Sequence, residues 1–128
     1  MRRYASLRGR REFAFVLRRG RASQTKHVAL TSVAAPPSGA TDRSPARVGI
    51  VITKKVGTAV ERNRLRRRAK AILDQSAIAD SAMWYVVVFR PAAAQLSYQH
   101  LQEQIEHVLA ASVRTAGAAR TRREIRRV

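Results

Sequence analysis

The chain has 128 residues, enough for one compact domain, and its 26 Lys and Arg against 8 Asp and Glu give a formal net charge of +18. It contains no cysteine, which excludes a disulfide scaffold, a Cys-ligated zinc site and a thiol nucleophile. A folded protein with this charge excess repels itself, so a polyanion is the expected partner: nucleic acid first, an anionic membrane surface second.

Six elements are expected in chain order from the spacing of apolar and turn-forming residues. Phe13, Val16 and Leu17 recur at i, i+3 and i+4, the period of a helix, and Gly20 suits its C-terminus. Three prolines and a glycine in residues 35–46 predict a loop. The expected elements are a helix over 10–19, antiparallel strands over 28–33 and 47–53, a helix from Thr58 to about Gln75, a strand over 84–89 and a final helix after Ser97.

Strands interleaved with helices that each carry one apolar stripe predict an α+β fold, a two-layer sandwich of one sheet with helices on one face. The open face of the sheet, beside a basic helix, would form a channel for a single strand of nucleic acid. Residues 113–128 mix Ala and Arg, and we expect them to be a disordered basic tail behind a domain of residues 1–112. The Arg-rich start also fits a mitochondrial transit peptide, but residues 13–17 continue it with core-like side chains.

The helix from Thr58 carries a dense charge. Thr58 and Glu61 have the spacing of a capping box, and the apolar residues from Leu65 to Leu73 cluster in an arc that faces the core. Beside that arc, basic residues follow one another at i, i+4 and i+8 and repel each other unless phosphates lie between them. We call this set the basic ridge: Arg62, Arg66 and Lys70.

Residues 48–70, VGIVITKKVGTAVERNRLRRRAK, resemble the signature of the bacterial ribonuclease P protein subunit, in which a strand is followed by Lys-Lys, a glycine, Ala-Val and Arg-Asn-Arg. Residues around Phe13 and Gly20 resemble that family's first helix, and Arg90-Pro91 its last strand-to-helix junction. The resemblance covers most of residues 5–112. It implies a mixed sheet with a left-handed strand-helix-strand crossover, similar to the second domain of ribosomal protein S5.

The resemblance also implies a function. Members of the family bind a catalytic RNA and the 5′ leader of precursor tRNA, and promote endonucleolytic removal of the leader. The RNA performs the hydrolysis with Mg²⁺, so we expect no catalytic residue, metal or cofactor in this chain. The expected partners are the catalytic RNA and precursor tRNA, with no membrane and no obligate protein partner, in the cytoplasm.

Two sets of site residues follow from the resemblance. The expected RNA-binding set is Lys54, Lys55, Arg62, Asn63, Arg64, Arg66, Arg67, Arg68 and Lys70. The expected leader cleft is Phe13, Leu17, Val28, Leu30 and Thr31. Relatives often carry aromatics at three of these cleft positions, so this cleft is expected to hold the leader by backbone contacts and apolar packing. Arg68 stands where an apolar residue is common, and either points to solvent or contacts a phosphate.

An alternative is a structural RNA-binding protein such as a ribosomal component, which the composition alone favours. A protein nuclease would need a general base or carboxylates that hold metal. The eight acids are scattered singly, and His27, His100 and His107 lack the spacing of a ligand set or triad. The signature in residues 48–70 is what favours the ribonuclease P subunit over the ribosomal alternative.

Overall fold

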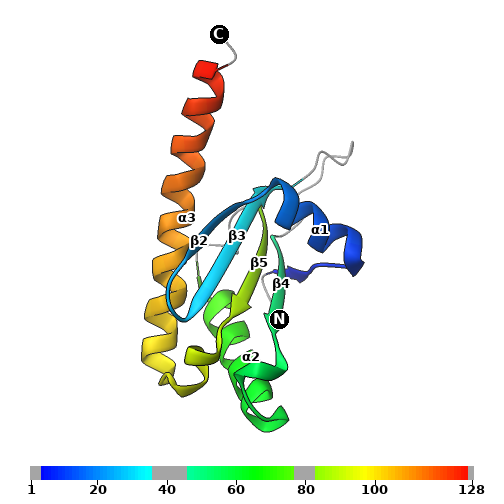
Figure 1. Cartoon of the computed structure of the whole chain (residues 1–128), viewed down its shortest axis with the longest axis vertical. Coiled ribbons are helices and arrows are strands. Elements are labelled where there is room, and N and C mark those ends of the chain that lie inside the picture. Colours follow the sequence, from blue (N-terminus) through cyan, green and yellow to red (C-terminus); the bar gives the residue numbers. More distant parts are fainter. Residues whose placement is uncertain (1–3, 36–45, 77–82, 127–128) are drawn as a thin grey trace.

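The computed structural model describes residues 4–35, 46–76 and 83–126, with side chains as far as Ser112 (Figure 1). All six predicted elements are present, and most of the predicted loop over residues 35–46 lies outside the described residues. The elements are β1 (Ala5–Ser6), α1 (Gly9–Arg19), β2 (Arg21–Gln24), β3 (Val28–Ala34), β4 (Arg47–Ile52), the 3-10 turn η1 (Lys54–Val56), α2 (Ala59–Asp74), β5 (Met83–Phe89), the 3-10 turn η3 (Pro91–Gln95) and α3 (Tyr98–Arg126).

The strands form one mixed sheet in the order β1-β4-β5-β3-β2. β5 lies at its centre, parallel to β4 and antiparallel to β3. β4, α2 and β5 therefore make a crossover unit between neighbouring parallel strands, and the predicted α+β class is confirmed. β3 and β4, expected as antiparallel strands joined by a loop, do run in opposite directions, but β5 is inserted between them.

Helices cover both faces of the sheet, which corrects the expectation of helices on one face. α2 and α3 pack over one face, in a core that includes Val48, Tyr85 and Val87. α1 packs on the other face, where the fully buried Val16 shares a cluster with Val86. The physical reason is that β5 is apolar on both faces, so each face needs a cover.

Two further differences from the sequence prediction have local causes. β1 has two residues and β2 reads RASQ, so neither shows the apolar alternation that reveals a strand; they pair with β4 and β3 at the sheet edges. The tail expected to be disordered from residue 113 has instead a helical backbone, since α3 continues to Arg126, past the end of the sheet (Figure 1). Ala and Arg, which dominate this segment, are strong helix formers.

The capping box predicted at the start of α2 is present. Thr58 Oγ1 accepts the Glu61 backbone N–H at 3.2 Å, and Glu61 Oε1 accepts the Thr58 N–H at 3.0 Å. The hydrogen bond from the Thr58 backbone N–H first, and then the Thr58 side chain, lower the pKa of the Glu61 carboxyl, and the charge of Arg64 adds to the effect. The negative charge of Glu61 also offsets the positive charge of the basic residues near the N-terminus of α2, which is the positive end of the helix dipole.

Glu61→Gln tests this cap by its pH dependence. The pKa of Glu61 in the folded chain lies below its ordinary value of 4.5, so the carboxylate stabilises the fold above that pH, and this contribution is lost as the pH falls through the folded pKa. We expect the thermal midpoint of the wild type to fall more steeply below pH 4.5 than that of E61Q. The exposed Glu103→Gln is the control and should follow the wild type; parallel curves for E61Q and wild type would contradict the prediction.

Candidate nucleic-acid interface

α2 turns one face to the core and the other to solvent, as the sequence predicts. Leu65, Ala69, Ile72 and Leu73 are buried. The nine expected RNA-binding residues lie on one continuous stretch of η1 and α2, with both lysines on the 3-10 turn directly before the helix rather than at a strand end. Lys54, Lys55, Asn63, Arg64 and Arg67 are exposed, whereas Arg62, Arg66, Arg68 and Lys70 are half-buried.

The half-buried cations line the two flanks of α2. Arg66 and Lys70 line a hollow of about 190 Å³. Phe13 of α1, which packs on the opposite face of the sheet, lines the same hollow. The hollow therefore extends around the β1 edge of the sheet from the α2 face to the α1 face. Arg68 lies on the opposite flank, beside η3, where its Nη1 donates to the Leu96 carbonyl oxygen at 3.5 Å. This long contact directs Arg68 toward the protein rather than into open solvent.

Arg62 carries a donor without an acceptor. Its Nε is buried and has no hydrogen-bond partner among the described residues. A buried, unsatisfied donor costs about 1–3 kcal/mol. The Nε–H and a neighbouring Nη–H of a guanidinium form a fork that matches two oxygens of one phosphate. A phosphate oxygen placed at Arg62 would supply the acceptor that this donor lacks.

α1 and the sheet face beneath it form a second candidate surface. The Phe13 ring lies directly over Gly49 of β4: a Cβ built at Gly49 would be 2.4 Å from the ring, so only glycine admits this packing. Leu17 is 57% exposed. Thr31 lies beside Gly20 on the same face, since a Cβ at Gly20 would be 2.6 Å from its methyl group. Three of the five predicted cleft residues thus share this face.

The other two predicted cleft residues do not belong to it. Val28 and Leu30 are 0% and 1% exposed and lie in the core beneath α3, so the prediction that they line the cleft is wrong. Successive strand residues face opposite sides, which puts Ala29 on the α1 side instead. Partly buried Val51 and Val88 extend the same floor and were missed. The alternation of side chains along β3 could have revealed this, because the larger apolar side chains mark the face of the strand that packs against the core.

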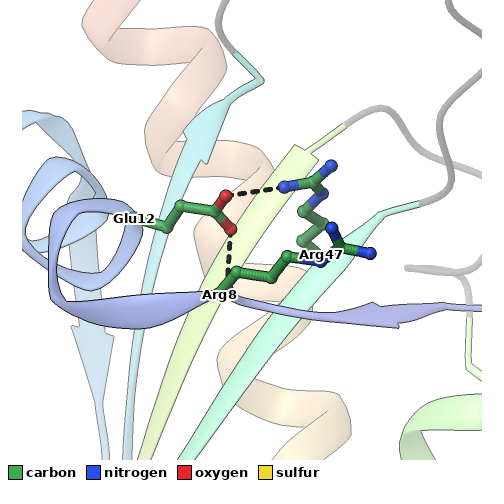
Figure 2. Close-up of polar contacts among 3 residues, drawn as sticks. All are labelled: Arg8, Glu12 and Arg47. Atoms are coloured by element: carbon green, nitrogen blue, oxygen red, sulfur yellow. Dashed lines mark hydrogen bonds and ion pairs between the residues drawn. The ribbon is translucent and has the colours of Figure 1, made fainter.

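A polar cluster holds α1 on the sheet (Figure 2). Glu12 Oε2 accepts from Arg47 Nη1 at 2.7 Å in an ion pair, and Glu12 Oε1 accepts the backbone N–H of Arg8, also at 2.7 Å. The Arg47 guanidinium carbon lies 5.0 Å from the centroid of the Trp84 ring, which meets Phe15 edge to face. The first turn of α1 is thereby tied to β4 and β5, which positions the cleft side of the helix.

Acidic groups near both surfaces serve the fold. Glu12 holds α1 and Glu61 caps α2. Within the described ranges, no three His, Cys, Asp or Glu side chains gather as a set of metal ligands. His100 and His107 are exposed on α3, and His27 is half-buried. None of the helices, over the residues described, is long and apolar enough to cross a membrane. What the two surfaces offer is cationic donors and apolar contact.

A guanidinium-rich helix on one face of a mixed α+β sheet is typical of a nucleic-acid-binding protein. The family model described as Ribonuclease P matches residues 1–113. The ribonuclease P protein component of Clavibacter michiganensis is 33% identical over 107 residues, covering 81% of this chain and 88% of the relative. That of Microcystis aeruginosa is 31% identical, covering 80% and 86%. The chain belongs to the ribonuclease P protein family.

Solved structures agree in fold. The Staphylococcus aureus RNase P protein superposes with a TM-score of 0.70 at 21% identity, covering 83% of this chain and 93% of that one. The Thermotoga maritima RNase P protein gives 0.66 at 21% identity, covering 81% and 94%. The resemblance seen in residues 48–70 is thus confirmed, and the family is that of the protein component of an endoribonuclease holoenzyme. This decides against the ribosomal alternative.

Gly49→Ala is expected to destabilise the fold. The added Cβ would displace the Phe13 ring, and overpacking of this kind costs about 1–3 kcal/mol, measurable by urea unfolding. In a Phe13→Leu background the shorter side chain leaves room, so the same glycine substitution should cost less there. Equal costs in both backgrounds would show that the packing of Phe13 over Gly49 does not govern the position of α1.

Proposed function

We propose that this chain is the protein subunit of ribonuclease P and binds two RNA segments at once. The catalytic RNA binds η1 and α2, and the 5′ leader of precursor tRNA lies in the cleft between α1 and the sheet. The observation that carries this proposal is the hollow in which Arg66 and Lys70 of α2 meet Phe13 of α1, because it joins the two surfaces. Removal of the leader then yields the mature 5′ end of the tRNA.

The basic ridge suits a structured RNA backbone. From Arg62 to Lys70 a helix rises about 12 Å, enough to meet several phosphates. The unpartnered Nε of Arg62 supplies a donor for one of them. Lys54 and Lys55 lie next to the N-terminus of α2, where free backbone N–H groups also favour an anion. The bound phosphates would relieve the mutual repulsion of the ridge.

Hydrolysis of the phosphodiester is assigned in this proposal to the RNA partner, where bound Mg²⁺ supplies the metal chemistry. The residues of this chain bind and orient: α2 anchors the catalytic RNA, and α1 with the sheet holds the leader. The proposal gives the chain no cofactor and no further obligate protein partner, and it places the reaction in the cytoplasm. Two features of the family resemblance support it, the basic signature and the cleft aromatic at Phe13.

The cleft explains how a non-catalytic subunit improves the reaction. Substrate and product differ by the leader, so contacts to the leader favour substrate binding over product binding. The floor, made of Ala29, Thr31, Val51 and Val88, is aliphatic apart from one hydroxyl. It suits packing against riboses and bases without stacking, while Phe13 adds a ring at the side.

Reconstitution with catalytic RNA tests the proposed division of labour. The purified chain with precursor tRNA and Mg²⁺ should give no specific cleavage, and addition of ribonuclease P RNA should produce cleavage at the mature 5′ end. The protein should also lower the Mg²⁺ concentration that the RNA requires, because its cations replace part of the counterion charge. Specific cleavage by the chain alone, or an unchanged Mg²⁺ requirement, would contradict the proposal.

The salt dependence of RNA binding tests the basic ridge. Arg62→Gln/Arg66→Gln should lower the slope of log affinity for the catalytic RNA against log salt by about 1.4–1.8, at 0.7–0.9 per lost phosphate contact. The matched control is Arg19→Gln/Lys26→Gln, which removes the same charge from exposed positions outside α2. If both double variants shift the slope equally, the ridge makes no direct phosphate contact. Thermal unfolding verifies that both remain folded.

A further inference from the structure

The outer side of α1 is a second basic surface that neither α2 nor the cleft uses. α1 packs on the sheet through Val16 and leaves its opposite side in solvent. We call the residues on that side the α1 strip: Arg10, Arg11, Ala14 and Arg18, all exposed. The strip is about 12 Å long, since the helix rises by eight residue steps of about 1.5 Å from Arg10 to Arg18.

The strip is continuous with the cleft. Each helical residue advances by about 100°, so the side chains follow a fixed order around α1. Starting from Phe13 at the cleft, Leu17 comes next, then Arg10 and Ala14, and then Arg18 with Arg11 behind it. Leu17, at 57% exposed, forms the boundary between the two surfaces. An RNA strand that leaves the cleft past Leu17 would therefore lie directly beside the arginines of the α1 strip.

The arginines of the strip have no carboxylate to neutralise them. Glu12 is the one acid of α1, and its two oxygens are engaged by Arg47 and by the backbone N–H of Arg8. Over the described part of the chain, no ion pair joins Arg10, Arg11 or Arg18 to an acid. Ala14 lies between them and lets a backbone approach the helix closely. The α1 strip therefore has the chemistry of a surface that binds the phosphates of a nucleic-acid backbone.

We propose that the α1 strip binds the phosphates of leader nucleotides that extend beyond the cleft. This inference rests on the leader cleft of the proposed function and adds to it a second contact that only longer leaders reach. The leader is the occupant because the strip adjoins the cleft, whereas α2, which anchors the catalytic RNA, lies on the opposite face of the sheet. Charge complementarity supplies the affinity, without base selectivity.

The test uses the reconstituted holoenzyme and precursor tRNAs that differ only in leader length: one nucleotide, about five, or about twelve, within the span that single-strand binding sites cover. The variant is Arg10→Gln/Arg18→Gln, and the matched control is Arg19→Gln/Lys26→Gln. We expect the variant to bind the two shorter substrates like the wild type and to lose the extra affinity for the longest. Its salt slope with the longest leader should fall by about 1.4 for two lost contacts.

Three results would overturn the inference, and they are distinguishable. If variant and control bind the longest leader equally, the strip does not contact the leader. If the variant weakens binding of the catalytic RNA itself, the strip belongs to that partner instead. If the wild type shows no gain between one nucleotide and about five, within the span of single-strand sites, the cleft of the proposed function fails, and the strip inference falls with it.

Discussion

The burial of β5 from both sides is the interaction on which the rest of this structure depends. Val86, Val87 and Phe89 are each 1% exposed, with Val86 facing α1 and the other two facing the core under α2 and α3. Each such side chain contributes about 1.5–3 kcal/mol when fully buried. Because one strand anchors both layers, α1 and α2 keep fixed positions on opposite faces, and the two proposed RNA-binding surfaces lie on those faces.

The stability of this core allows α2 to carry charge that an isolated helix would not tolerate. Like charges at i, i+4 destabilise a helix by about 0.2–0.5 kcal/mol per pair. The apolar arc of α2, from Leu65 to Leu73, and the cap made by Thr58 and Glu61 offset this repulsion. Under the proposed function, bound phosphates would neutralise this charge, so RNA binding and the stability of the chain would be mutually dependent.

Close approach of α1 to the sheet shapes the cleft. Glycines allow it at two points, beneath Phe13 at Gly49 and beside Thr31 at Gly20, where a Cβ would also lie 2.4 Å from the Val16 carbonyl oxygen. The ion pair of Glu12 with Arg47 then sets the position of the first turn. With α1 held this close, its inner side packs on the sheet and its outer side stays in solvent, which is the arrangement that the proposed leader contacts require.

The sequence by itself determined α2, its cap and the class of its partner, because helical periodicity, the Thr58–Glu61 exchange and a dense run of cations are local properties of contiguous residues. Only the tertiary structure decided the edges of the sheet and the membership of the cleft. Two residues such as Ala5–Ser6 become a strand only when β4 offers unpaired hydrogen-bonding groups. Val28 and Leu30 lie beneath α3 rather than in the cleft because the two faces of a strand become different only when helices cover them.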